Sequence, residues 1–258
     1  IHETRYTQPL VYLTTLLAFQ SFNDFHVSFD GVAGFSLGEY SAYYAANLFD
    51  ALSLLSLVDQ RAQLMHEETQ KTKGKMAAII GLNQETVKNL CDNHDGIVVA
   101  ANFNSPIQTV ISGQEEDVLS LIDQAKAQGA KRAMMLQVSG AFHSPLMEPA
   151  SNKFYEILKG LEMKEPKVPI YLNTTAKPLV KEELFTQMKN QIHSPVLFTQ
   201  LIHQMTDDGF THFIEIGPGN VLSGLIRKIN PDLQIINLGK TSDIELVKGW
   251  LIEHGFIK

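Results

Sequence analysis

The chain has 258 residues, of which 44% are hydrophobic and 19% charged, so it has the composition of a globular protein with a sizeable core. Its formal net charge of −7 gives no electrostatic basis for binding nucleic acid or an anionic membrane. The single cysteine, Cys91, excludes an internal disulfide and a cysteine-built metal site, and we expect no metal. Neither a membrane-spanning apolar run nor a signal-peptide pattern is found, so the chain is predicted to be cytoplasmic.

The segment Gly34-Phe35-Ser36-Leu37-Gly38 lies between a predicted strand and a predicted helix. A buried helix is expected first, over residues 11–22, with Pro9 near its first turn. A short buried strand is expected at 27–33, and helical spacing returns at 40–48. A Gly-x-Ser-x-Gly turn in this context is typical of a nucleophile elbow, where glycines on both sides of the serine avoid clashes with the strand and the helix. The alternative is an ordinary glycine turn.

Arg61 lies near the C-terminal end of the next predicted helix, over residues 50–66, and interrupts the apolar face of that helix. One interpretation is a solvated arginine at a helix terminus, where a cation is favourable. The other is a fixed cation that points into a cleft and pairs with an anionic group. The pattern alone leaves both interpretations open.

The composition changes after a polar, glycine-containing linker at 70–75, and a second structural unit is predicted to follow it. The strands and helices expected there have the order βαββαβ and cover 76–80, 84–93, 97–103, 108–112, 115–128 and 133–138. This order is ferredoxin-like. We therefore expect a small subdomain over residues 74–137, inserted into a larger one made of residues 1–73 and 138–258.

A glycine-led loop, Gly140-Ala141-Phe142-His143-Ser144, follows the last strand of this insert. Its histidine is a candidate general base, because α/β enzymes place catalytic groups on loops that follow strands. His193 lies in a similar Ile-His-Ser-Pro run and is the competing candidate. A structural histidine is the alternative in both cases.

Strands and helices alternate again over the rest of the chain. The expected strands are 170–173, 210–216 and 235–237, and helices are expected to end near 191 and to cover 198–205, 221–229 and 244–254. Alternation of this kind predicts an α/β fold with a mainly parallel sheet that is covered on both faces. Ser36, His143 and the turn at 217–220 would then gather at the carboxyl ends of their strands.

Four motifs together resemble the family of malonyl-CoA:acyl-carrier-protein transacylases and polyketide synthase acyltransferases. They are the elbow, Arg61 at its spacing from Ser36, Gly140-Ala141-Phe142-His143-Ser144 and Glu215-Ile216-Gly217-Pro218-Gly219. The resemblance covers nearly the whole chain and implies an α/β-hydrolase-like core with a ferredoxin-like insert. It also implies transfer of a malonyl group from coenzyme A to the phosphopantetheine thiol of an acyl carrier protein, or of a synthase carrier domain, with no permanently bound cofactor.

The resemblance also implies roles for individual residues. Ser36 would be the nucleophile and His143 the base, oriented by the main-chain oxygen of Gln191. Leu37 would supply an oxyanion-hole amide, and Arg61 would pair with the malonyl carboxylate through two hydrogen bonds. The residues implied to line the acyl pocket are Gln8, Met65 and Phe142. The last of these is expected to exclude a 2-methyl branch.

Two features depart from the family pattern. Phe35 replaces the histidine that usually precedes the nucleophile, which affects packing or acyl selectivity and not the base. Family members also begin with a strand carrying Gly-Gln-Gly-Ser-Gln, whose glutamine supplies a second oxyanion donor, and the sequence from Ile1 has no such stretch. This start suggests a segment cut from a longer polypeptide. Without that strand the transfer rate is expected to fall steeply.

Two other functions are open at this point. One is an acyl hydrolase that clears carrier-bound acyl groups, against which Arg61 argues, because a general hydrolase does not need a buried cation. The other is a non-catalytic module that docks carrier proteins. Between fatty-acid and polyketide synthesis, Phe35 slightly favours the polyketide pathway.

Overall fold

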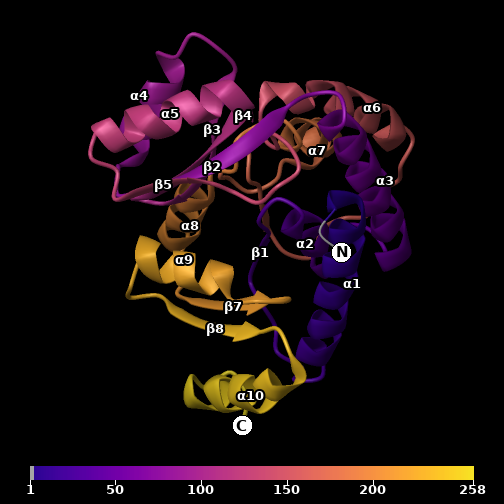
Figure 1. Cartoon of the computed structure of the whole chain (residues 1–258). Helices are drawn as coiled ribbons and strands as arrows, with labels where there is room; N and C mark the ends of the chain where they lie inside the picture. Colours follow the sequence, from indigo (N-terminus) through magenta and orange to yellow (C-terminus); the bar gives the residue numbers. More distant parts are fainter. Residues whose placement is uncertain (1–2) are drawn as a thin grey trace.

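A computed structural model describes residues 3–258, which form a mixed α/β fold (Figure 1). The α-helices are α1 (Thr4–Asn23), α2 (Gly38–Ala45), α3 (Ala51–Thr69), α4 (Gln84–Asp92), α5 (Glu115–Ala127), α6 (Glu148–Leu158), α7 (Leu184–Gln191), α8 (Phe198–Asp207), α9 (Val221–Ile229) and α10 (Ile244–Glu253). The strands are β1 (Val32–Ala33), β2 (Gly74–Ile80), β3 (Val98–Ser105), β4 (Gln108–Gln114), β5 (Arg132–Met135), β6 (Ile170–Tyr171), β7 (His212–Ile216) and β8 (Gln234–Leu238). Short 3-10 turns lie at Pro145–Met147, Lys181–Glu183 and Thr241–Asp243.

Helix α1 begins at Thr4, earlier than expected, and Pro9 therefore lies inside it and not near its first turn. A proline at this position removes one N–H from the helical ladder, which disfavours a helix. Tertiary packing outweighs this penalty, because α1 lies along α3 and buries Gln8 and Tyr12 against the rest of the protein.

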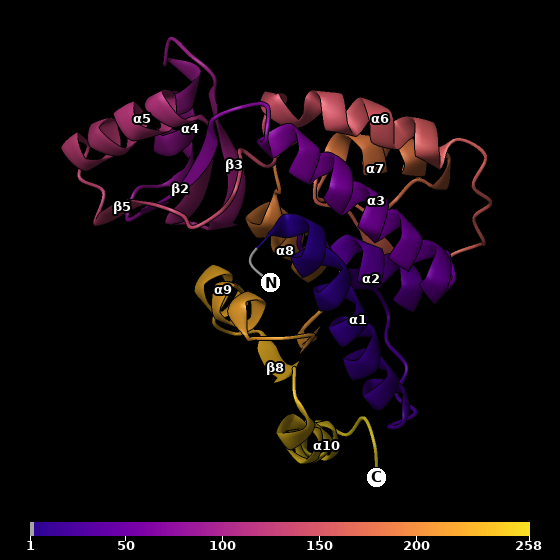
Figure 2. The same ribbon diagram turned by 45° about the vertical axis from the view of Figure 1, so that its right-hand side comes forward.

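Strands β2 to β5 form an antiparallel sheet with the order β3-β4-β2-β5. Helices α4 and α5 cover one face of this sheet, and an apolar core lies between them (Figure 1). Its buried members include Ile79 on β2, Ile111 on β4 and Leu121 on α5. Helices α3, α6 and α7 pack together beside this unit (Figure 2).

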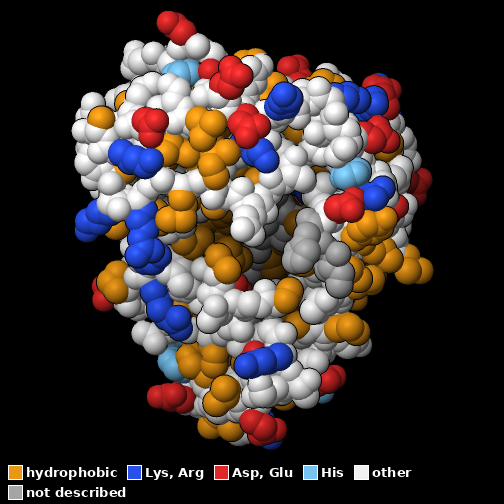
Figure 3. Space-filling view, viewed as in Figure 1, with side chains coloured by type: hydrophobic (Ala, Val, Ile, Leu, Met, Phe, Trp, Pro, Cys, Tyr) orange, Lys and Arg blue, Asp and Glu red, His pale blue; other side chains and the backbone are white. Residues whose placement is uncertain are grey.

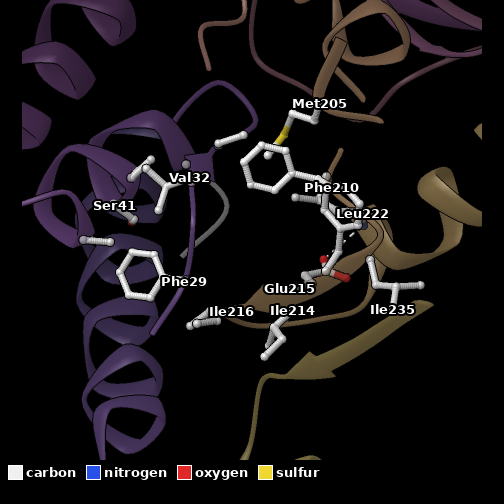
Figure 4. Close-up of a pocket in the computed structure, with 18 of the residues that line it drawn as sticks. Phe29, Val32, Ser41, Met205, Phe210, Ile214, Glu215, Ile216, Leu222 and Ile235 are labelled. Carbon is white, nitrogen blue, oxygen red and sulfur yellow. Dashed lines mark hydrogen bonds between the residues drawn. The ribbon is translucent and has the colours of Figure 1, made fainter. Parts of the chain in front are cut away.

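The parallel strands within residues 3–258 form two separate pairs, β1-β6 and β7-β8, and not the continuous, mainly parallel sheet that was expected. Strand β1 is also shorter than the expected strand at 27–33, since only two of its residues pair with β6. Residues of β1 and β7 line a cavity of about 960 Å³. Phe29, Val32, Phe210 and Ile214 line it, so its walls are mostly apolar (Figure 4).

The largest apolar core lies between α1, α2, α3, α6 and α7. Tyr12, Tyr43, Leu54 and Phe154 are fully buried there. This core fixes α2 and α3 relative to each other, and these two helices carry residues of the candidate site. Among the helices that the structure describes, none combines the length and the apolar character needed to cross a membrane.

Candidate active site

The turn between β1 and α2 places Ser36 in a strained backbone conformation, with φ of +50°. Non-glycine residues rarely adopt such values, and they do so mainly where the surroundings enforce them. Here the Asn173 side chain enforces the turn: its Oδ1 accepts the Ser36 N–H at 2.6 Å and its Nδ2 donates to the Gly34 carbonyl at 2.6 Å. The elbow is therefore fastened to the segment that follows β6.

Both elbow glycines were expected to be needed to avoid steric clashes, but only Gly34 is. A Cβ on Gly34 would lie 1.9 Å from the Gly38 carbonyl carbon, whereas a Cβ on Gly38 meets nothing within 4 Å. The first distance is far inside van der Waals contact, so Gly34 permits the close approach of the turn to α2.

We expect Gly34→Ala to abolish a folded elbow and Gly38→Ala to be tolerated. The first substitution requires backbone movement, with an expected loss of several kcal/mol of stability, on the order of the largest single-site effects. The second adds a methyl group in open space at the start of a helix and changes stability by about 1 kcal/mol or less. Thermal unfolding of both variants tests this, and equal melting temperatures would contradict it.

The Ser36 hydroxyl contacts the imidazole of His143, with 2.8 Å between Oγ and Nε2. The other ring nitrogen, Nδ1, lies 2.9 Å from the main-chain oxygen of Gln191 and 3.2 Å from that of Ser194. Two carbonyl acceptors require the hydrogen on Nδ1, which leaves Nε2 free to accept the Ser36 proton. His143 also has positive φ, +58°, so the backbone is strained on both sides of this contact.

His143 is buried. Burial, and to a smaller extent the positive charge of Arg61, lowers its pKa from 6.5 to about 4. The imidazole is therefore neutral at physiological pH, as a general base must be. The competing candidate, His193, lies elsewhere: its Nδ1 is 2.9 Å from the Ser151 hydroxyl, and no contact with Ser36 is found among the described residues.

Arg61 is a buried cation and not a solvated helix-terminal residue, since only 1% of it is exposed. Its guanidinium donates to the Gln8 side-chain oxygen, to Ser36 Oγ at 3.2 Å and to Gln191 Oε1 at 2.9 Å. It also lies 5.5 Å from the centre of the Tyr40 ring. Burial lowers its pKa, but an arginine remains protonated in proteins. The site thus holds a fixed positive charge next to the serine.

A cavity of about 410 Å³ opens beside these groups. The expected site residues that line it are Gln8, Ser36, Leu37, Arg61, Met65, Phe142 and His143. Side chains of β3, β4 and α9 close its other sides, so it lies between the antiparallel sheet and the rest of the chain. The face in Figure 3 is hollowed near its centre, in the region between the sheet and α9.

The Leu37 N–H lies at the start of α2, and no acceptor for it is found among residues 3–258. A free amide next to a nucleophile is the kind of donor that stabilises an oxyanion. Phe35 lines the same cavity and packs edge-on against Phe198, with ring centres 5.3 Å apart. It therefore contacts both the cavity and the apolar core that includes residues of α8.

Sequence reasoning missed two site residues, Glu39 and Asn173. Both are buried and polar, with exposed fractions of 2% and 0%. Glu39 was visible as a charged residue on the helix that follows the elbow, but Asn173 had no local signal. Sequence reasoning also missed the Gln191 side chain, whose Nε2 donates to the Ser36 carbonyl oxygen at 2.7 Å.

A serine hydroxyl bonded to an oriented imidazole, next to a free amide, is the arrangement of nucleophilic acyl-transfer sites. The sequence matches the family described as acyl transferase domain over residues 1–232, and the chain belongs to this family. In the part of the chain that the structure describes, no three His, Cys, Asp or Glu side chains form a group able to hold a metal ion.

Relatives and solved structures agree with this assignment. A malonyl CoA-acyl carrier protein transacylase from Bacillus subtilis is 39% identical over 243 residues, which is 93% of this chain and 77% of the relative. The MCAT structure from Streptococcus pneumoniae has a TM-score of 0.91 at 35% identity and covers 96% of this chain and 82% of its own. A malonyl-transacylase solved in complex with its type II PKS acyl-carrier protein has a TM-score of 0.90 at 34% identity, with coverages of 94% and 80%.

Proposed function

We propose that this chain transfers a malonyl group from coenzyme A to the phosphopantetheine thiol of an acyl carrier protein, in fatty-acid or polyketide synthesis. The observation that carries the proposal is the meeting of Ser36, His143 and Arg61 in one cavity, with Ser36 Oγ 2.8 Å from the imidazole and 3.2 Å from the guanidinium. The names of the relatives support it, as does the solved complex of a malonyl-transacylase with its acyl-carrier protein.

In the first half-reaction Ser36 Oγ attacks the thioester carbonyl carbon of malonyl-CoA. His143 Nε2 takes the hydroxyl proton, and the Leu37 N–H stabilises the oxyanion. The C–S bond then breaks, and the proton on Nε2 passes to the departing thiolate. Coenzyme A leaves as a thiol and malonyl remains as an ester on Ser36.

The second half-reaction reverses these steps with another thiol. The phosphopantetheine sulfur attacks the ester carbonyl, His143 takes the thiol proton and returns it to Ser36 Oγ, and the malonyl thioester leaves with the carrier. The bonds that are broken and formed in the exchange have similar energies. Positioning the reactants and stabilising the developing charge are therefore sufficient for catalysis.

Arg61 supplies the selectivity for a malonyl group. A carboxylate left unpaired in a closed pocket is unfavourable, whereas a planar guanidinium binds both of its oxygens. Gln8 and Met65, which contact each other at 3.6 Å, line the acyl pocket, and Phe142 lies next to the base, where its ring excludes a branch on the acyl chain.

We also propose the finer fold assignment. Residues 74–137 form a ferredoxin-like subdomain, which the βαββαβ element order and the antiparallel strand order support. Residues 1–73 and 138–258 form an α/β-hydrolase-like subdomain, which the strand-turn-helix elbow supports.

Intact mass spectrometry after exposure to malonyl-CoA tests the proposed function. We expect a malonyl adduct on Ser36 that disappears when a holo acyl carrier protein is added, with malonyl found on the carrier. Adduct loss to free malonate without a loaded carrier would support the hydrolase instead. A chain that never acquires the adduct would support the docking module. Either result contradicts the proposal.

The low pKa of His143 predicts a loss of stability in acid. The unfolded state binds a proton at this residue near pH 6.5 and the folded state only near pH 4, so the contribution of His143 to stability decreases as pH falls through this window. At pH 5 this contribution is expected to be about 2 kcal/mol lower than at pH 7.5, whereas the raised pKa of Glu39 changes the stability of both chains in the opposite direction. Urea unfolding of the native chain and of His143→Gln at both pH values checks this. The variant should lose less stability than the native chain, and equal losses would contradict the prediction.

A further inference from the structure

We infer that Glu39 is a positioning residue for the acyl-transfer site, through which both Arg61 and the Ser36 elbow are held in place. The inference rests on the proposed function and adds a residue to it. Glu39 touches neither the cavity nor the reacting atoms, and it acts through the residues that do.

Glu39 lies in the first turn of α2 and is buried, yet both of its carboxylate oxygens have partners. Oε1 accepts the main-chain N–H of Asn173. Oε2 accepts from Gln191 Nε2 at 2.9 Å and from the Tyr43 hydroxyl at 3.2 Å. A buried carboxylate with this many donors is a fixed point in the structure.

The first branch from Glu39 leads to the nucleophile. Its partner Asn173 holds the elbow through its side chain, with bonds to the Ser36 N–H and the Gly34 carbonyl. A shift of the Asn173 main chain therefore moves the strained turn that presents the Ser36 hydroxyl.

The second branch leads to Arg61 and depends on the polarity of an amide. A carboxylate can only accept hydrogen bonds, so Glu39 requires Gln191 to point Nε2 towards it. The opposite atom, Oε1, then faces Arg61 and accepts from its guanidinium at 2.9 Å. Nε2 also donates to the Ser36 carbonyl oxygen at 2.7 Å, so the Glu39 carboxylate is one of two acceptors that hold the amide in the orientation that Arg61 requires.

Charge supports the same assignment. Burial raises the pKa of Glu39 to about 7, while the hydrogen bonds from Asn173 and Gln191 and the charge of Arg61 oppose that rise. The titratable groups facing Glu39 are Tyr40 and Tyr43 on its own helix and Arg61 on α3, and burial raises the pKa of both tyrosines. Among Glu39 and the groups that face it, Glu39 is therefore the one whose charge changes near pH 7.

The test compares Glu39→Gln with a matched control, Glu68→Gln. Glu68 is another buried glutamate, 5% exposed, and it pairs with Lys71 away from the site. Initial rates of Ser36 acylation are measured with malonyl-CoA and acetyl-CoA between pH 6 and 8.5, and melting temperatures are measured alongside. Glu39→Asp serves as the conservative variant, since it keeps the charge but shortens the side chain.

In Glu39→Gln we expect malonylation to slow about 100-fold, the usual cost of a misplaced site. Acetylation should slow at least tenfold less, since acetyl does not use Arg61. The native rate should fall as pH decreases through 7, and the variant should lose this dependence. Glu39→Asp should recover part of the malonyl preference. An unchanged malonyl-to-acetyl ratio in Glu39→Gln, or an equal change in Glu68→Gln, overturns the inference.

A second readout separates this inference from the proposed function. Labelling of Ser36 by phenylmethanesulfonyl fluoride needs an aligned hydroxyl but no malonyl group. If the native chain is labelled and forms no malonyl adduct, the proposed function is refuted but the inference about Glu39 is not. Slower labelling of Glu39→Gln than of Glu68→Gln then still supports the role of Glu39 in holding the elbow, and equal labelling rates contradict it.

Discussion

Replacing Ser36 by alanine is expected to abolish acyl transfer, with a loss of about 10⁴-fold or more in rate. The hydroxyl is the part of the residue that hydrogen-bonds to His143, and the substitution removes the atom proposed to carry the acyl group. Binding of malonyl-CoA should change little, because Arg61 and the cavity remain. Steady-state transfer to a carrier protein and intact mass after malonyl-CoA exposure measure the two effects.

Ser41→Ala is the matched control for Ser36→Ala. Ser41 lies on α2, the helix that follows the elbow, and lines the apolar cavity between β1 and β7, not the one that contains His143 (Figure 4). We expect its activity to equal that of the native chain. Retention of a malonyl adduct in Ser36→Ala would show that another residue carries the acyl group and would refute the proposed nucleophile.

Replacing Arg61 by alanine is expected to lower kcat/KM for malonyl-CoA about 10³-fold. This corresponds to about 4 kcal/mol, the usual loss when one partner of a buried ion pair is removed. Transfer from acetyl-CoA should fall far less, so the variant should prefer acetyl over malonyl. Competition between the two thioesters for one pool of enzyme, read by mass spectrometry, gives the ratio directly.

Arg61→Lys separates charge from geometry. Lysine keeps the positive charge but cannot bind both oxygens of a carboxylate in a plane, so we expect it to recover only part of the malonyl preference. Both substitutions remove donors from Gln8 and Gln191, so melting temperatures must be compared with that of the native chain. An unchanged preference for malonyl in Arg61→Ala would exclude Arg61 as the carboxylate partner.

The parts of the fold that were predicted well have strong local patterns. Helix α9 has the predicted bounds, and the segments of β2 to β5 with α4 and α5 differ from their predictions by a few residues at their ends. Alternation in the strands and charge on one side of the helices determine these elements locally. Strand β1 and helix α1 were placed less well, because pairing with β6 and packing against α3 decide their limits.

The candidate site divides in the same way. Ser36, His143 and Arg61 became candidates because each belongs to a motif or interrupts a pattern, and the structure brings the three side chains together. Glu39 and Asn173 were missed, because the contacts that give them a role join residues 134 to 152 positions apart. Such contacts exist only after the chain has folded. The positive φ of His143 is likewise a property of the assembled site and not of its sequence.

The main-chain oxygens that hold the His143 ring have a consequence for the bonds that the site can break. A carbonyl dipole stabilises an imidazolium less than a full negative charge does, so the ring gives up its proton readily and is a weak base. Sulfur leaves as an anion with little assistance, since the pKa of a thiol is about 8.5, whereas an amine must be protonated first. We therefore expect this enzyme to exchange acyl groups between thiols while leaving peptide bonds intact.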